Sequence, residues 1–283
     1  MAHDQPLPEG TLLDGRYCLR ARIGEGGMAT VYEAEDLRLS RVVALKVLKG
    51  CHASASTDAE RMFRDARNAA RSDHPSVITV YGYGHDEEED AHFVAMERLR
   101  GETLAERIAR VGPLPLADVV RFGIALFDAL DAVHGAQVIH RDLKPANIFL
   151  ATRGRRTDEV TLLDFGVSRA LDLSTLTATG ETYGTPAYMA PELLSDSRTV
   201  GPRTDLYALG IVLYECVTGR LPFKAKALAT LTAEILLGPN LDVRIYRPEC
   251  PQPLAEIIMR CAMREPAARF ARAAEVGDAL AAL

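Results

Sequence analysis

Apolar residues in the first hundred positions occur in short runs of strand length, separated by polar and turn-forming residues. The clearest of these runs are 42–47, 77–83 and 92–97. Such runs are typical of antiparallel strands joined by turns. One stretch, about residues 57–72, instead reads as a helix, with Thr57 or Asp58 as its N-cap. The pattern therefore predicts a small, mainly β region that contains a single helix.

Helical periodicity dominates the remainder of the chain. Within residues 116–134, large apolar side chains recur every three or four positions and form one stripe, at Val119, Phe122, Leu126, Leu130 and Val133. Further helices are expected at 102–110, 254–263 and 273–283, and two short strands flank a basic turn at 154–156. We expect an α+β chain with a larger, mainly α second part, in which His134 is only a helix-end residue.

Composition and charge narrow the classes of function. The chain has 283 residues, of which 48% are hydrophobic and 25% charged, as in ordinary globular proteins. A formal net charge of -6 argues against a nucleic-acid partner. No apolar run approaches the roughly 18 residues of a membrane span, and the N-terminus has no apolar core of a signal peptide. Five scattered cysteines without CxxC spacing favour a reducing, cytoplasmic setting.

One polar stretch, His140–Asn147 (HRDLKPAN), lies between apolar runs and is predicted to be a loop between buried strands. Asp142 can accept a proton, and Lys144 can neutralise a phosphate. Asn147 carries an amide oxygen that a hard cation accepts, and a second acid follows at Asp164. A base, a cation and two metal ligands are what phosphoryl transfer from a magnesium nucleotide requires.

HRDLKPAN followed by Asp164-Phe-Gly resembles the protein kinase superfamily, and most of all the bacterial eukaryotic-like Ser/Thr protein kinases. The resemblance implies a bilobal fold, with a β N-lobe carrying one helix and a mainly α C-lobe. Its expected limits are a flexible segment at 1–14 and a kinase domain at 15–283. Within the domain we expect the N-lobe at about 15–97, the hinge at about 98–101 and the C-lobe at about 102–283.

A nucleotide site is predicted from glycines and a buried lysine. The spacing of Gly24, Gly26 and Val31 resembles the kinase Gly-rich loop, and strand-like residues follow where a dinucleotide fold would have a helix. Lys46 interrupts an apolar strand and therefore needs an anion, which the resemblance supplies as the phosphates of ATP. The resemblance implies Mg²⁺ or Mn²⁺ as the metal. It completes the nucleotide pocket with Ile23, Gly27, Ala44, Met96, Glu97, Leu99 and Phe149.

The helix partner of Lys46 departs from the family pattern. The family places a glutamate nine residues before the histidine of His74-Pro75, and this chain has Asp65 there. Aspartate is one methylene shorter, which removes about 1.5 Å of reach. We therefore expect the Lys46–Asp65 pair to be long or absent in the unphosphorylated protein.

The stretch from Asp164 to Glu192 resembles a kinase activation segment. It is rich in hydroxyl groups, and a phosphate on it could recruit arginines and order it. By position, Thr177 and Thr179 correspond to the phosphorylated pair of the bacterial family, and Arg141 precedes Asp142 as in kinases switched this way. A merely flexible loop is the alternative.

The resemblance also implies structural roles and a type of substrate. Asp205 would hold the HRD backbone, and Arg269 would pair with Glu192. Lys144 and Thr185 indicate Ser/Thr acceptors. The chain is thus interpreted as a protein kinase that phosphorylates its own activation segment. The resemblance alone implies that two copies form a transient homodimer for this step. A pseudokinase, supported only by Asp65, and a small-molecule phosphotransferase, which would lack the LKPAN and APE motifs, are the alternatives.

Overall fold

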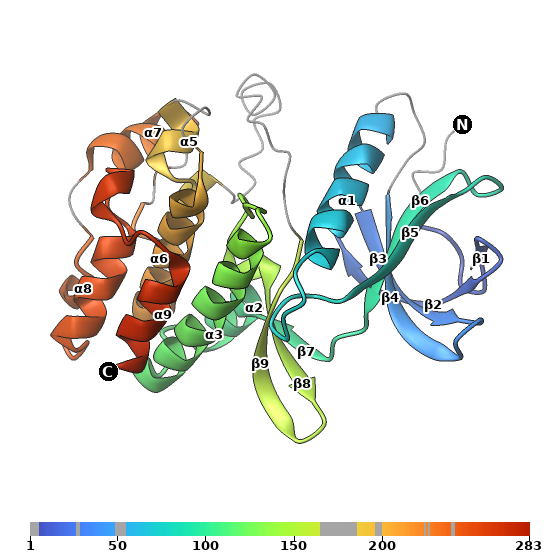
Figure 1. Ribbon diagram of the computed structural model, residues 1–283, viewed down its shortest axis with the longest axis horizontal. Coiled ribbons are helices and arrows are strands. Elements are labelled where there is room, and N and C mark those ends of the chain that lie inside the picture. Colours follow the sequence, from blue (N-terminus) through green and yellow to red (C-terminus); the bar gives the residue numbers. More distant parts are fainter. Residues whose placement is uncertain are drawn as a thin grey trace. The chain divides into compact units, whose positions relative to one another are not determined.

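The computed structural model divides the chain into two compact units (Figure 1). The first contains residues 1–71 and 78–100, and the second contains residues 72–77 and 101–283. The residues that the structure describes are 6–26, 29–48, 55–164, 186–195, 200–223, 225, 227–238 and 241–283, with the backbone alone for 55–58 and 61.

The unit boundaries differ from the predicted lobes at two places. Residues 98–100, expected in the hinge, belong to the first unit. Residues 72–77, expected in the N-lobe, belong to the second, because Ser76 accepts a backbone hydrogen bond of 2.8 Å from Leu162 and Val77 bridges the same residue. The strand expected at 77–83 is therefore observed only from Val80 onward.

A six-stranded antiparallel sheet forms the first unit. Its strands lie in the order β1-β2-β3-β4-β6-β5. Their bounds are β1 Leu12–Leu13, β2 Tyr17–Glu25, β3 Ala29–Asp36, β4 Arg41–Leu48, β5 Val80–Asp86 and β6 Ala91–Glu97. Alternate side chains of β3, such as Tyr32 and Ala34, point into a core shared with Tyr17, Leu45 and Phe93. Helix α1 (Ala55–Ala70) packs on the opposite face, where Met62 and Ala66 contact Val94.

The expectation that residues 1–14 are loosely ordered is wrong for the described part of that segment. Strand β1 extends the sheet at its edge, and Leu13 is fully buried. Leu7 donates its backbone N–H to the Tyr32 hydroxyl at 2.9 Å. Asp86, the first residue of an acidic run at 86–90, is buried and accepts the backbone N–H of Asp14 at 2.7 Å. Leu7 and Leu13 thus pack against the edge of the core.

Helices make up most of the second unit. Their bounds are α2 Leu104–Val111, α3 Leu116–Gly135, α5 Pro191–Ser195, α6 Pro202–Thr218, α7 Leu228–Leu237, α8 Gln252–Cys261 and α9 Ala273–Ala281. The apolar stripe predicted for α3 is buried throughout. Helix α9 runs alongside α3, where Gly123 leaves space for Leu280 (Figure 1). In the described part of the chain, no helix combines the length and apolar character needed to cross a bilayer.

Three antiparallel strands complete the second unit: β7 Gly101–Thr103, β8 Ile148–Arg153 and β9 Arg156–Leu162. Residues 136–144, by contrast, form no strand, so the expectation of strands on both sides of HRDLKPAN holds only on its C-terminal side. The chain passes from α3 through a short loop into a 3-10 turn, η1 (Pro145–Asn147), and then into β8.

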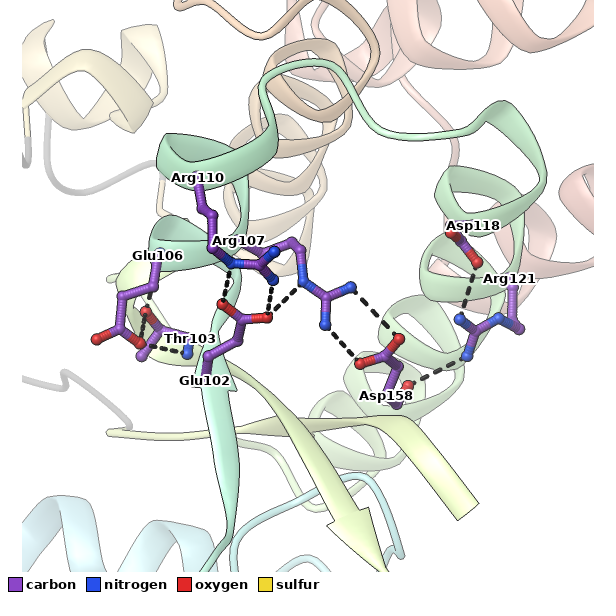
Figure 2. A network of polar contacts seen from close by, with 8 residues as sticks. All are labelled: Glu102, Thr103, Glu106, Arg107, Arg110, Asp118, Arg121 and Asp158. Carbon is purple, nitrogen blue, oxygen red and sulfur yellow. Dashed lines mark hydrogen bonds and ion pairs between the residues drawn. The ribbon is translucent and has the colours of Figure 1, made fainter. Parts of the chain in front are cut away.

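A network of ion pairs fixes β9 against α2 and α3 (Figure 2). Arg107 on α2 donates to Glu102 at 2.5 Å and to Asp158 at 2.7 Å. Arg121 on α3 donates to the carbonyl oxygen of Asp158 at 3.1 Å. Hydrogen bonds from Arg110 and Arg107 hold the pKa of Glu102 below its ordinary value. Because β9 leads directly to Asp164, this network anchors the strand that delivers the second acid.

Candidate active site

The HRDLKPAN loop brings two of its polar side chains, those of Lys144 and Asn147, into contact with Asp142. The Lys144 ammonium lies 2.8 Å from Oδ2 and 3.1 Å from Oδ1 of Asp142. The Asn147 amide nitrogen donates to the Asp142 carbonyl oxygen at 2.8 Å and to its Oδ2 at 3.0 Å. Pro145 starts the η1 turn that folds Asn147 back toward the acid. The Asp142 side chain remains 23% exposed, so a substrate hydroxyl can reach it.

Asn147 is oriented so that its amide oxygen is available as a metal ligand. The amide nitrogen of Asn147 faces two acceptors, the backbone carbonyl oxygen and Oδ2 of Asp142. A carbonyl oxygen never donates a hydrogen bond, and an ionised carboxylate does not donate either. The nitrogen must therefore face Asp142, and the oxygen lies on the other side of the amide group. An amide oxygen held in this way suits a hard cation.

Asp164 follows Leu163, whose backbone N–H and carbonyl groups are both hydrogen-bonded to the HRDLKPAN loop. Leu163 donates its N–H to the Asn147 carbonyl at 2.9 Å, and its own carbonyl accepts from His140 Nε2 at 3.0 Å. Asp164 is exposed and has a left-handed φ of 39°. The structure thus ties the backbone next to Asp164 to Asn147, the other predicted metal ligand.

The donor set fits a magnesium ion that is bound together with a nucleotide. Asn147 and Asp164 offer one amide oxygen and one carboxylate, and no group of three or more His, Cys, Asp or Glu side chains suited to a metal occurs in the described ranges. Mg²⁺ usually keeps several waters and is held by one or two carboxylates plus substrate phosphates. Asn147 and Asp164 are thus oxygen donors of the kind that a hard divalent cation accepts.

Asp205, at the start of α6, supports the HRD backbone from within the core. Its fully buried carboxylate accepts the N–H of Arg141 at Oδ1 and the N–H of His140 at Oδ2, both at 2.8 Å. Arg141 has a φ of 65°, a left-handed conformation that costs about 1–2 kcal/mol outside glycine. The two hydrogen bonds offset this cost and fix the backbone one residue before Asp142.

His134 contributes to the same support, which reasoning from the sequence missed. It lies in the last turn of α3 with its side chain 9% exposed, and its Nε2 is 2.8 Å from Asp205 Oδ2. The residue had been interpreted as a helix end. The signal that could have found it is its position four residues after Leu130, on the face of the apolar stripe.

Glu192 and Arg269 form a buried, bidentate ion pair, with N···O distances of 2.7 and 2.8 Å. The remaining N–H groups of Arg269 donate to the carbonyl oxygens of Met263, Arg203 and Arg264, so all five donors are used. Burial raises the pKa of Glu192, but hydrogen bonds and charge from Arg269 outweigh it, and the net pKa is lowered. This pair anchors the C-terminal end of the Asp164–Glu192 stretch.

Residues predicted to hold the nucleotide share one face of the sheet in the first unit. Gly24, Val31 and Lys46 are direct cross-strand neighbours on β2, β3 and β4. Two residues before Lys46 on β4, and so on the same face, Ala44 is paired with Met96 on β6. Cross-strand partners project from the same side of a sheet. These five residues therefore line one continuous surface.

The glycines on this surface are not required by the fold. A Cβ atom at Gly24 would meet Val31 at 3.6 Å, and one at Gly26 would meet the Ala29 carbonyl at 3.5 Å, both ordinary contacts. Neither glycine has the left-handed φ that would exclude other residues. The fold would therefore accept a side chain at either position, whereas glycine lets a ligand approach the backbone closely.

Asp65 lies on the helix face that packs against this same surface. Met62, Ala66 and Ala69 of α1 are buried, and Asp65 is half-buried between them. The core of this interface includes Val94, which is the cross-strand partner of Lys46. The helix thus presents Asp65 toward the lysine side of the sheet. The expected length of the Lys46–Asp65 pair stays a prediction.

The other predicted site residues are distributed as follows. Ile23 is partly exposed on β2, Glu97 ends β6, and Leu99 is buried just after it, all in the first unit. Phe149 lies on β8 in the second unit, and its expected place in the nucleotide pocket stays a prediction. Gly27, Thr177, Thr179 and Thr185 lie outside the described residues.

Comparisons with known proteins agree with this geometry. Residues 17–278 match the family model for the protein kinase domain. The chain is 34% identical to the Ser/Thr-protein kinase PrkC of Bacillus subtilis, over 94% of this chain and 40% of the relative. For pkn3 of Myxococcus xanthus the identity is 38%, over 93% and 49%. For PknL of Mycobacterium tuberculosis it is 35%, over 97% and 67%.

Solved structures show the same likeness. The PknI kinase domain of Mycobacterium tuberculosis superposes with a TM-score of 0.74 at 26% identity, covering 98% of this chain and 99% of that one. The curated relatives are longer, since the chain spans only 40% and 49% of the first two. The match is therefore to only part of each of these two relatives.

Proposed function

We propose, since this chain belongs to the protein kinase family, that it transfers the γ-phosphate of ATP to serine and threonine hydroxyls of proteins. The observation that carries this proposal is the arrangement at Asp142, whose carboxylate lies 2.8 Å from the Lys144 ammonium and 3.0 Å from the Asn147 amide nitrogen. A base held beside a cation and a metal ligand is what the transfer needs.

Each residue of the loop has a distinct task in this reaction. Asp142 orients the acceptor hydroxyl and accepts its proton as the oxygen attacks phosphorus. Lys144 offsets the negative charge that gathers on the transferred phosphoryl group. Asn147 and Asp164 would hold Mg²⁺ or Mn²⁺, which when bound neutralises phosphate charge. Lys46 would bind the α- and β-phosphates of the nucleotide.

The alternatives have less support. A pseudokinase usually lacks one of the residues required for catalysis, whereas Lys46, Asp142, Asn147 and Asp164 are all present. A small-molecule phosphotransferase would not match protein kinases over more than nine-tenths of this chain. Asp65 is the one substantive departure from the family pattern, and it shortens the reach of the acid without removing its charge.

The proposed activating event is autophosphorylation of Thr177 and Thr179. It is supported by Arg141, which stands directly before Asp142 and is held at its backbone by Asp205. Intact mass before and after incubation with Mg-ATP, followed by phosphopeptide mapping, tests it. Both threonines should gain phosphate in the native protein and remain empty in Asp142→Asn. The proposal is wrong if both sites stay empty while an external substrate is phosphorylated.

The proposed partners are protein substrates and, transiently, a second copy of this chain. The dimer is supported by exposed apolar side chains on the first unit: Leu12, Leu37, Leu39 and Val42. Leu12 and Val42 lie in one row across strands β1 to β4, with Cys18 and Glu35 between them. Phosphorylation between copies should accelerate with protein concentration, and Leu39→Glu should weaken that dependence. A rate that is independent of concentration would indicate phosphorylation within one chain.

A cytoplasmic setting is also part of the proposal. It is supported by Cys216, Cys250 and Cys261, which are buried free thiols. Burial raises the pKa of each, which keeps the groups protonated and unreactive.

A further inference from the structure

Two histidines face each other at the end of the β5–β6 hairpin in the first unit. His85 on β5 and His92 on β6 are direct cross-strand partners. Their rings are stacked, with centroids 4.2 Å apart and planes inclined by 30°. Such close stacking suits two neutral rings, or one neutral and one charged, and opposes two positive charges.

The same pair forms part of the surface on which α1 rests. Phe63 of α1 meets His92 edge to face at 5.6 Å and lies 4.9 Å from the ring of Tyr83 on β5. Arg67, one turn later, places its guanidinium 5.9 Å from the same tyrosine ring. His92 is therefore sandwiched between His85 of the hairpin and Phe63 of the helix.

The surroundings of His92 disfavour a charge on its ring. Its Nδ1 is buried and has no hydrogen-bond partner. The charged groups facing it are His85 from β5, Asp90 from the turn and, beyond Tyr83, Arg67 from α1. Of these, Asp90 is already engaged, with Oδ1 2.9 Å from His85 Nε2. Burial, together with the charge of His85, lowers the pKa of His92.

We propose that the His85–His92 stack is a proton-sensitive support for α1, which holds the helix on the hairpin while His92 is neutral and loosens it when His92 gains a proton. Because α1 carries Asp65, the loosening would reduce kinase activity, and only this consequence rests on the proposed function. The support itself rests on the ring geometry.

The direction of the pH dependence follows from proton binding. With a lowered pKa, His92 binds fewer protons when α1 is docked than when it is released. Docking is therefore fully favoured above about pH 6.5, the ordinary value for histidine, and weakens as the pH falls below it. Mild acidification would thus weaken the packing of α1 on the hairpin.

Hydrogen exchange of the α1 amides tests this without relying on activity. We would measure it on the full chain carrying Asp142→Asn, which removes autophosphorylation, between about pH 7.5 and 5.5 with correction for intrinsic exchange. We expect α1 protection to fall severalfold on acidification while that of β2 and β3 changes little. His92→Phe keeps an aromatic ring but cannot take a proton, and should abolish the fall.

His74→Gln is the matched control. His74 pairs with Asp128 in the second unit, so this variant should show the same fall in α1 protection as the native chain. A fall that persists in His92→Phe would overturn the proposal, as would equal protection of α1 at both ends of the pH range. If His92→Phe does not fold, the pKa of His92 in the native protein would be measured instead, by NMR titration. An ordinary or raised pKa for His92 would then overturn the idea.

Discussion

His134 Nε2 lies 2.8 Å from the Asp205 carboxylate that also receives the backbone N–H groups of His140 and Arg141. One buried acid on α6 therefore joins the end of α3 to the HRDLKPAN loop. Without the imidazole, the carboxylate loses one of its three donors and the loop loses part of its support.

We expect His134→Ala to lower kcat about tenfold with little change in the KM for ATP, since a hydrogen bond to a charged group contributes about 1.5–3 kcal/mol. His134→Gln should restore most of the rate, because its amide can donate from a similar position. Steady-state kinetics check this. A rise in KM with unchanged kcat, or no rescue by glutamine, would contradict a role in positioning the loop.

Replacing Asp142 with Asn should abolish phosphoryl transfer while nucleotide binding persists. The proposed contact of Asp142 is with the acceptor hydroxyl, and losing about 4 kcal/mol of transition-state stabilisation lowers the rate roughly a thousandfold. Radiolabel transfer and a fluorescent-nucleotide titration measure the two effects separately. Asp128→Asn, at an exposed acid on α3, serves as the control. An equal loss of nucleotide affinity would speak against this division of roles.

Arg269→Met should lower the free energy of unfolding by about 3–5 kcal/mol, because it leaves the Glu192 carboxylate buried without its cation. The matched control is Arg272→Met, which removes an arginine that is 70% exposed and paired with Asp131, and should cost less than about 1 kcal/mol. Urea denaturation compares the two. Similar losses in both variants would show that burial of the first pair is not decisive.

Asp36 provides a pH-dependent test of the first unit. Its buried carboxylate accepts two hydrogen bonds from Arg16, at 2.8 and 2.9 Å, which together with the arginine charge lower its pKa to about 2. The resulting stabilisation, about 2 kcal/mol, is present above the ordinary pKa near 4 and is lost as the pH falls toward 2. Asp36→Asn should therefore destabilise the protein near pH 7, and the difference from the native chain should shrink below about pH 4. A constant difference would refute the assignment.

Asp65→Glu should raise the basal activity of the unphosphorylated protein, or at least not lower it. The longer acid recovers about 1.5 Å of reach toward Lys46, so α1 need not shift to close the pair. Rates would be compared in a Thr177→Ala, Thr179→Ala background. A severe loss of activity would show that the surroundings are fitted to aspartate.

Local patterns predicted most of the helices and strands, because these depend on short-range order. The α3 stripe and the Asp142–Asn147 spacing can be read directly from neighbouring residues. Two of the contacts that were missed join distant positions, His134 with Asp205 and Ser76 with Leu162. A third, His85 with His92, crosses a hairpin. Strand register and helix packing set such contacts, and residue types alone do not reveal them. For the same reason Leu13 was not recognised as part of the core.

The family match begins at residue 17 and ends at residue 278, whereas the folded core extends past both limits. Leu13 of β1 and Leu280 of α9 are each fully buried. Cutting the gene at the family boundaries would uncover β2 as a free edge strand and remove a side chain packed on α3, both of which favour aggregation. Useful recombinant fragments should therefore begin before Leu7 and retain α9 to its last turn.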